Sequence, residues 1–237
     1  MRLITIYILI ISFLYSNNED WDEILKYSAY FSGIHVANAT LKSKQKTNLV
    51  NKEILHIEFE AKSRSSVKYI FPINDIISID VETDNWEPIK VEKQLQEGNY
   101  IHNSIAEFNH NERKFIFKKD TIAFLEKVMN PYSLIYFFRT KTLTPDTSYQ
   151  INIVDNKKII PLSFHVEHRE KIKTTKGNFF ANKIWPQRND GRPFKNAGKM
   201  TIWYSEEEKI PLMINLKLKF GSLNLKLVDI NQDRSID

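Results

Sequence analysis

Histidine is the first side chain to consider for acid–base chemistry or metal binding, because its ordinary pKa lies close to neutrality. The 237-residue chain has six histidines, at His35, His56, His102, His110, His165 and His168. The last two belong to the motif His165-Val166-Glu167-His168. On a strand, residues three apart point to opposite faces, and the familiar zinc motif needs two histidines four apart on a helix. We therefore predict no metal site and no cofactor.

Nucleophilic catalysis has no recognisable motif in this sequence. The chain has no cysteine, which excludes thiol catalysis and disulfide bonds. It contains neither a serine elbow of the G-x-S-x-G type nor a glycine-rich phosphate loop. Asp75, Asp80 and Asp84 lack the glycine and the glutamate of a calcium loop, so we expect them at strand ends and turns. No catalytic residue is predicted, although a triad assembled from distant positions stays open.

Aromatic and cationic side chains supply the candidates for ligand binding. Trp86, Trp185 and Trp203 each lie near a predicted strand, where indole rings either line a cavity for lipids or sugars or fill the core. Arg139 either meets a carboxylate or an anionic ligand in a cavity, or holds the last carbonyls of a helix. The candidate ligand-binding residues are Arg139, Tyr132, Trp185 and Trp203.

Strands must position most of these residues, because apolar and polar side chains alternate with period two along the chain. Across residues 216–227 the apolar positions are even before Gly221 and odd after Ser222. A two-residue turn at Gly221-Ser222 resolves this switch, and a bulge at Gly221 is the alternative. The pairs predicted for the hairpin are Phe220 with Leu223, Leu218 with Leu225, and Leu216 with Leu227.

Similar alternation predicts strands along the rest of the chain. They cover residues 54–61, 66–71, 76–81, 89–95, 100–108, 114–117, 149–153, 160–166, 201–204 and 210–214. Turn signals recur between them at the spacing typical of antiparallel sheets. The predicted fold is mainly β, a curved antiparallel sheet that is open and barrel-like or a sandwich, with one or two short helices.

The segment NPYSLIYFFR at residues 130–139 departs from this alternation. Asn130 is a good helix N-cap, and a proline such as Pro131 is favoured at the first helical position. The residues expected to share one helical face are Pro131, Leu134, Ile135 and Phe138. We predict a short helix across the mouth or the concave face of the sheet. A second helical turn is expected at residues 122–129.

The N-terminus has the layout of a secretory signal peptide. Residues 1–16 begin with Arg2, continue through an apolar run and reach Ser16 before a polar cluster. The run is shorter than the roughly 20 apolar residues of a transmembrane span, so we predict cleavage near Ser16, with an uncleaved anchor as the alternative. The remainder, residues 17–237, is predicted to be a single β-rich domain without a further transmembrane helix, since no linker-like stretch interrupts it.

The charge of the chain is basic but mixed. The 34 basic residues are interleaved with 29 acidic ones, and the formal charge of +5 becomes +4 when Arg2 leaves with the signal peptide. A nucleic-acid-binding protein usually concentrates its cations on one face, so we predict no nucleic-acid partner. A basic surface can favour anionic lipid head groups or acidic glycans, but a solvated polar surface is the simpler interpretation.

Several phrases together resemble a family of bacterial exported proteins, the domain of unknown function 3108. The phrases lie at residues 25–41, 130–139, 174–186 and 202–227 and follow the order of the family. In the second phrase Ser133 and Arg139 match, and Asn130 stands where relatives commonly carry an aspartate. In the first phrase Asn38 replaces a glycine that relatives often carry. The resemblance implies a β-rich envelope protein, periplasmic in a two-membrane bacterium, and it implies no catalytic residues.

Three functional hypotheses follow from these observations. The leading one is a non-enzymatic periplasmic protein, a binding protein or a scaffold for a hydrophobic or amphipathic envelope molecule or for a protein partner. The second is a hydrolase of envelope glycan or lipid that uses dispersed carboxylates and a histidine. The third is an assembly factor associated with the outer membrane, which captures a strand at an exposed sheet edge. The expected partners are thus a lipid, a glycan or an envelope protein.

Overall fold

One curved sheet makes up almost the whole protein. A computed structural model describes residues 20–47, 52–192, 197–218 and 221–232 of the chain. Within these residues fifteen strands form a single sheet in the order β8-β7-β6-β5-β4-β3-β2-β1-β15-β14-β13-β12-β11-β10-β9. The predicted signal peptide at residues 1–16 lies outside the described residues.

The elements follow one another along the chain as a series of hairpins. Their bounds are β1 (Glu23–Phe31), β2 (Ile34–Thr47), β3 (Glu53–Ser63), β4 (Asn74–Glu82), β5 (Pro88–Glu97), β6 (Tyr100–Asn109), β7 (Lys114–Phe117), β8 (Asp120–Ala123), β9 (Val128–Met129), α1 (Ser133–Arg139), β10 (Ser148–Asp155), β11 (Lys158–Thr174), β12 (Gly177–Arg188), β13 (Ala197–Ser205), β14 (Pro211–Leu218) and β15 (Gly221–Gln232). Neighbouring strands pair antiparallel, apart from the parallel pair of β9 and β10.

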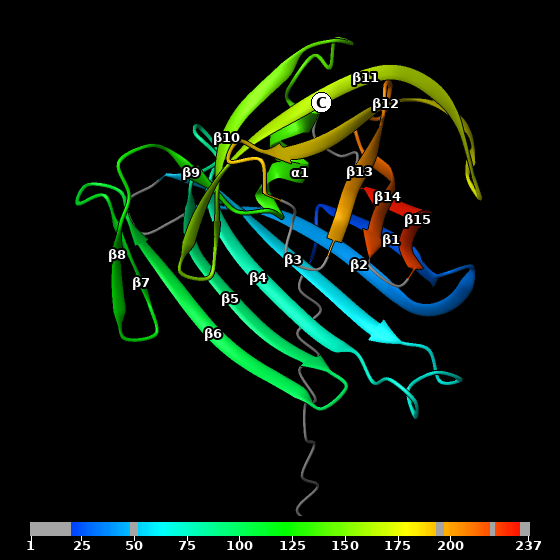
Figure 1. Cartoon of the computed structure of the whole chain (residues 1–237), viewed down its shortest axis with the longest axis horizontal. Helices are drawn as coiled ribbons and strands as arrows, with labels where there is room; N and C mark the ends of the chain where they lie inside the picture. Colours follow the sequence, from blue (N-terminus) through cyan, green and yellow to red (C-terminus); the bar gives the residue numbers. More distant parts are fainter. Residues whose placement is uncertain (1–19, 48–51, 193–196, 219–220, 233–237) are drawn as a thin grey trace, which may run out of the picture.

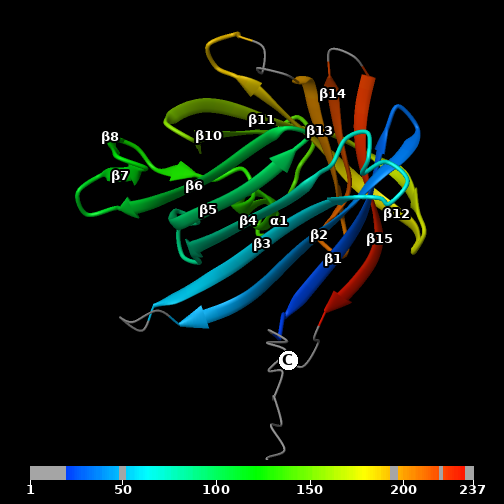
Figure 2. The ribbon, with the colours of Figure 1, turned by 90° about the horizontal axis from the view of Figure 1, so that it is seen from below.

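The two ends of the described chain meet in the middle of the sheet. β1 pairs with β2 on one side and with β15 on the other. From this centre the strands extend in both directions and curve around α1, which lies inside the curve (Figures 1 and 2). The predicted curved antiparallel sheet is therefore confirmed in its open, barrel-like form. The sandwich form does not arise, because the strands of the described residues share one continuous sheet.

The inner face of the sheet, which faces α1, carries the core. On β1 the alternate residues Leu25, Tyr27 and Ala29 are buried, as period-two alternation requires. Two hydrophobic clusters meet at the helix. Ile135 and Tyr136 belong to the cluster that includes β1 to β7. The remaining apolar residues of α1 belong to a second cluster built with β10 to β13, and they are Leu134, Phe137 and Phe138.

The helix begins later than the sequence predicts and is buried on every side. It starts at Ser133, and Tyr132 rather than Asn130 occupies the N-cap. Asn130 lies two residues before the N-cap, and its Oδ1 accepts a hydrogen bond from the Tyr132 amide at 3.0 Å. The Ser133 hydroxyl donates to the Asn130 carbonyl at 3.0 Å and accepts from the Asn130 amide at 3.2 Å. Residues 133–138 are all buried, so the single apolar face predicted for this segment is wrong.

Two other predicted elements are wrong, because short apolar runs do not distinguish between helix, strand and turn. Residues 122–129 form no helix; they include the end of β8 and the two-residue strand β9. Residues 66–71, predicted as a strand, form turns closed by the hydrogen bonds Val67 N to Arg64 O and Phe71 N to Val67 O. Among the described residues no helix is long and apolar enough to cross a membrane.

The C-terminal hairpin forms with a register different from the predicted one. Leu216 pairs with Leu223 and Leu218 with Gly221, so the predicted pairs are wrong and Gly221 belongs to β15; residues 219–220 lie outside the described residues. The shift is even, which keeps the leucines on the same face. A β-carbon at Gly221, whose φ is +118°, would lie 2.4 Å from the Ser32 hydroxyl. Glycine is therefore favoured at position 221, chiefly by this positive φ and also by the close approach of the Ser32 hydroxyl and the Phe31 ring.

Candidate functional site

Arg139, the first candidate residue, is tied to the other end of the chain. At the C-terminus of α1 its Nη1 donates to Glu23 Oε1 at 2.5 Å and its Nη2 donates to Glu23 Oε2 at 2.8 Å. Gln232 Nε2 donates to the same carboxylate at 2.6 Å. The contact joins β1, α1 and β15. The sequence alternative in which Arg139 holds helix carbonyls is wrong, because the Phe137 carbonyl is capped by Thr140.

The environment of Arg139 suits a structural ion pair. Burial alone would lower the pKa of Arg139, but the hydrogen bonds and the negative charge of Glu23 raise it. Bidentate pairing with a carboxylate uses the guanidinium in its preferred geometry. With one carboxylate holding both terminal nitrogens, Arg139 locks the helix onto the sheet rather than offering a free cation to a ligand.

Tyr132 lies at the start of α1 and reaches toward the opposite half of the sheet. Its ring packs on Phe59 of β3, with ring centroids 5.2 Å apart. Burial raises the pKa of the Tyr132 phenol, and the nearby carboxylates of Asp75, Asp155 and Glu97 raise it further. Tyr132 therefore stays a neutral hydroxyl beside an acidic group on the inner face.

Asp75 is the buried member of this acidic group. It lies on β4, is 8% exposed, and accepts a hydrogen bond from the Gln96 amide at 2.9 Å. Burial raises the pKa of Asp75 to about 6; the Gln96 hydrogen bond opposes this and the Glu97 carboxylate adds to it. Asp155, another carboxylate of this group, forms an ion pair with Lys93 at 3.1 Å. Asp75 can thus hold a proton near neutral pH.

The predicted tryptophan candidates do not converge with Arg139. On β12, Ile184 is buried against the core, so its neighbour Trp185 points to the outer face. The Trp185 ring stacks on His165 with centroids 4.5 Å apart. Trp203 pairs with Lys183 and donates its indole N–H to Glu170. Trp185 and Trp203 thus share the outer face, away from Arg139 and Tyr132. Trp86, the other indole near a predicted strand, packs against both core clusters.

The histidines and the other aspartates likewise stay apart. His56 Nδ1 lies 2.6 Å from Asp80 Oδ1 across β3 and β4, within the strands rather than at their ends. Burial alone would raise the pKa of Asp80, but the hydrogen bond and charge of His56 lower it. Asp84 lies in the β4–β5 turn, as predicted. In the described ranges no three His, Asp or Glu side chains gather closely enough to hold a metal ion.

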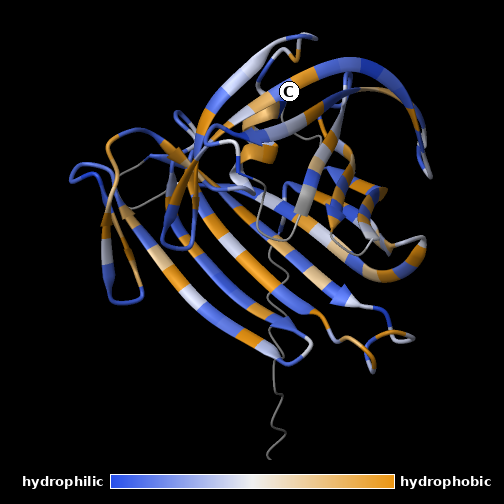
Figure 3. Ribbon diagram, viewed as in Figure 1, coloured by the Kyte–Doolittle hydropathy of each residue, from blue (hydrophilic) through white to orange (hydrophobic). Residues whose placement is uncertain are grey.

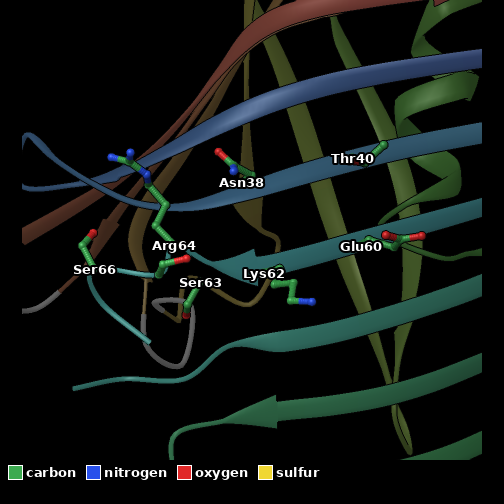
Figure 4. Close-up of a pocket in the computed structure, with 8 residues that line it drawn as sticks. Asn38, Thr40, Glu60, Lys62, Ser63, Arg64 and Ser66 are labelled. Carbon is green, nitrogen blue, oxygen red and sulfur yellow. The ribbon is translucent and has the colours of Figure 1, made fainter. Parts of the chain in front are cut away.

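A polar hollow of about 580 Å³ lies on the outer face instead, beside the end of β3. Asn38 and Thr40 of β2 pair with Lys62 and Glu60 of β3, and all four alternate with buried or half-buried inner residues. Figure 4 shows these side chains with those of the following turn. We call this feature the outer hollow, and its lining residues are Asn38, Thr40, Glu60, Lys62, Ser63, Arg64, Ser65 and Ser66.

The outer hollow has a positive character. Its one acidic residue, Glu60, contacts Lys42; burial alone would raise the pKa of Glu60, and the Lys42 contact lowers it. Neither Lys62 nor Arg64 forms a side-chain ion pair within the part of the chain that the structure describes. Two cations beside the hydroxyls of Ser65 and Ser66 form the kind of donor set that binds a phosphate or carboxylate group.

Sequence reasoning missed the outer hollow because it treated residues 66–71 as a strand. The signal was nevertheless present in Arg64-Ser65-Ser66, three polar residues that interrupt the alternation directly after β3. Such an interruption favours a turn, and side chains of a turn at a strand end can surround a ligand.

Comparisons with known proteins agree with this fold. The model of DUF3108, described as a protein of unknown function, matches residues 26–228. A β-barrel-like protein of domain of unknown function DUF1849 from Brucella abortus is similar in structure. It has a TM-score of 0.59 and 12% identity, over 90% of this chain and 98% of that chain.

Two further solved structures are similar at lower scores. One, from Bacteroides fragilis, is described as a candidate exported protein with a YmcC-like fold. It has a TM-score of 0.41 and 9% identity, over 90% of this chain and 97% of that one. The other is a candidate lipoprotein from Parabacteroides distasonis, with a TM-score of 0.38 and 11% identity, over 90% of this chain and 96% of that one. No curated protein matches the chain significantly.

Proposed function

The chain belongs to the DUF3108 family, and we propose that it is a non-enzymatic, exported binding protein of the periplasm. Its ligand in this proposal is an amphipathic envelope molecule with an anionic head group, bound at the outer hollow. The single observation that carries the proposal is the presence of two cations, Lys62 and Arg64, in a polar hollow of about 580 Å³. Small-molecule sites in proteins have volumes of this order, ~300–1,000 Å³.

The interior of the sheet supports this location less well. On the inner face, a cavity between β5, β6 and β10 is lined in part by Lys93, Ser104 and Asn130 and has a volume of about 10 Å³. A cavity of this size has room for roughly one water molecule. Since α1 also fills the centre of the curve, a ligand is better accommodated at the outer hollow than in the interior.

A hydrolase is the alternative function, and Asp75 is the observation in its favour. A carboxyl group with a pKa of about 6 beside Glu97 is suited to proton transfer. However, Asp75 is 8% exposed and one of its oxygens is held by the Gln96 amide, so little of it is accessible to a substrate. A binding role therefore agrees better with the described residues.

The test measures binding of a soluble, short-chain phosphatidylglycerol to the purified protein by calorimetry. The informative variant is Lys62→Gln/Arg64→Gln, and Lys119→Gln, an exposed lysine near β8, is the matched control. We expect saturable binding that the double variant weakens at least tenfold, because each charge-assisted hydrogen bond contributes about 1.5–3 kcal/mol. The control should bind as the natural protein does.

Three results separate the alternatives. Binding that the double variant leaves unchanged would rule out the outer hollow as the site. Absence of binding to phosphatidylglycerol, together with a protein free of extra mass in native mass spectrometry after gentle purification, would contradict the binding function. Hydrolysis of the lipid that disappears in Asp75→Asn would instead establish the hydrolase.

A further inference from the structure

Exposed apolar side chains gather at the same end of the sheet as the outer hollow. They lie in the β3–β4 turn and at the start of β6, directly after the β5–β6 turn. Tyr69 is 84% exposed, Ile70 is 85% exposed, and Ile101 is 70% exposed. We call this feature the apolar rim, and its residues are Tyr69, Ile70, Phe71, Tyr100 and Ile101.

The two turns of the apolar rim are in direct contact. The Gly98 amide donates to the Pro72 carbonyl at 2.7 Å, and Ile73 pairs with Glu97 as an isolated bridge. A β-carbon at Gly98 would lie 3.1 Å from Phe71 Cε2, which places the Phe71 ring against the second turn. The two turns therefore lie together at one end of the sheet, where Tyr69, Ile70 and Phe71 follow one another in the first turn and Tyr100 and Ile101 point to opposite faces of β6. Apolar residues at this lower right end are visible in Figure 3.

The base of the β3–β4 turn is fixed while its apolar side chains stay in solvent. The Ser63 hydroxyl donates to the Phe71 carbonyl at 2.9 Å and accepts from the Ile73 amide at 2.7 Å. The Arg64 amide donates to Val36 of β2 at 2.9 Å. This anchoring orders the backbone of the turn, and the exposed side chains make no comparable contribution to the core. Contiguous exposed apolar surface of this kind usually marks an interaction site.

The charges around the apolar rim indicate what it contacts. Lys68 Nζ lies 5.0 Å from the Tyr69 ring centroid, and Lys62 and Arg64 line the adjoining outer hollow. The acidic residues are Glu97 at the rim and Glu60 in the outer hollow, and Glu60 contacts Lys42, so the three cations outnumber the two carboxylates. Apolar and tyrosine side chains flanked by lysine and arginine suit the interface of an anionic bilayer, where rings enter the acyl boundary and cations meet the head groups.

We propose that the apolar rim docks the protein on the surface of an anionic lipid bilayer, with Tyr69 and Ile70 entering the interface and Lys62, Arg64 and Lys68 meeting lipid phosphates. This inference rests on the proposed function and deepens it, because it names a membrane as the source of the amphipathic molecule. The docked orientation places the outer hollow next to the head groups.

The test is co-sedimentation of the purified protein with two kinds of vesicle, phosphatidylcholine alone and phosphatidylcholine mixed with phosphatidylglycerol. We expect binding to the anionic vesicles that weakens as salt concentration rises. Tyr69→Ser/Ile70→Ser should weaken this binding about tenfold, since two interfacial apolar side chains are lost. Leu125→Ser, which changes a 92% exposed side chain elsewhere, is the matched control and should bind normally.

A charge variant gives the second readout. Lys68→Glu should weaken binding to the anionic vesicles at least fivefold and reduce its salt dependence, because each cation near such a surface contributes about 1 kcal/mol. The exposed Lys119→Glu serves as its control. Both rim variants change exposed side chains, and an unchanged circular dichroism spectrum establishes that they fold.

The remaining outcomes overturn the docking proposal in distinguishable ways. Binding of short-chain phosphatidylglycerol without vesicle binding would agree with the proposed function and contradict docking on a membrane. Vesicle binding that is the same in the rim variants and their controls would place the contact elsewhere on the protein. A dimer that the Tyr69→Ser/Ile70→Ser variant converts to monomer, with no vesicle binding, would show that a second copy covers the rim.

Discussion

The half of the sheet filled by α1 and the apolar rim at the far end use similar side chains in opposite ways. Around the helix, Phe138 and Tyr204 are almost completely buried and pack with ring centroids 6.0 Å apart. At the rim, Tyr69 and Ile70 are almost completely exposed. The difference is the presence of a covering element, since α1 reaches β10 to β13 but the turns at the rim extend beyond it (Figure 1).

Buried carboxylates show the same contrast between regions. Glu23 lies on the inner face of β1 and is held by both terminal nitrogens of Arg139. Asp75 lies on the inner face of β4, where its close carboxylate neighbour is Glu97. The carboxylate beside the end of α1 is therefore paired with a cation, while Asp75 on β4 is a carboxyl whose pKa is raised by burial. The protonation state of a buried carboxyl in this sheet thus depends on which side chains pack against it.

Removing a ring from the helix-filled half should have the largest effect. Phe138→Ala is expected to lower the free energy of unfolding by about 3–5 kcal/mol, because it leaves a cavity among Phe164, Tyr149 and Tyr204. Ile70→Ser at the rim should change it by less than about 0.5 kcal/mol. Urea denaturation of the two variants measures both values, and equal effects would contradict the contrast between the regions.

Breaking the ion pair of the helix-filled half should have the next largest effect. Arg139→Met is expected to lower the free energy of unfolding by about 3 kcal/mol, because Glu23 stays buried without its cation. Gln232 still donates to that carboxylate, which keeps the loss from being larger. Adding Glu23→Gln to this variant should restore part of the stability in thermal or urea melts.

The exposed pair Lys26–Asp229, 3.2 Å apart, is the control for this prediction. Lys26→Met should cost less than about 1 kcal/mol, as exposed ion pairs usually do. If Arg139→Met and Lys26→Met had the same small effect, Arg139 would not lock the helix onto the sheet.

Asp75 should make stability depend on pH in the other half. The pKa of Asp75 is about 6 in the folded chain and 3.8 when the carboxyl is fully solvated. Between these two pH values the folded protein therefore binds a proton that the unfolded chain releases. The contribution of Asp75 to the free energy of unfolding is therefore fully present below about pH 4. It falls as the pH rises to about 6 and is absent at higher pH.

The variant that tests this dependence is Asp75→Asn. This variant should raise the free energy of unfolding at pH 7 by about 1–2 kcal/mol, since solvent near the carboxyl weakens the effect of burial. At pH 4 it should change the free energy of unfolding little. Asparagine keeps an oxygen for the Gln96 amide. A stability difference that is the same at every pH from 4 to 8 would refute the raised pKa.

Sequence patterns predicted local secondary structure better than they predicted which strand residues pair with each other. Alternation located the two strands near Gly221 and put Leu216 and Leu223 on one face, but it assigned the wrong cross-strand partners. An even shift preserves the faces, so the pattern cannot detect it. The same limitation applied to residues 66–71, because alternation does not tell a buried strand face from an exposed turn.

The candidate site was the part least accessible from the sequence. Arg139 was correctly noted as a cation that needs a partner, yet Glu23 lies 116 positions away and no spacing rule joins them. The outer hollow similarly depends on the register that sets Asn38 opposite Lys62. Neither contact has a local signature.

The sequence by itself determined the mainly β composition, the alternating faces and the helical segment near residues 133–139, because these depend on local backbone preference and side-chain period. The tertiary structure alone decided that α1 is buried on every side, that Glu23 meets Arg139, and that Tyr69 and Ile70 stay exposed. These features depend on contacts between distant residues, whose energy exists only once the sheet has curved around the helix.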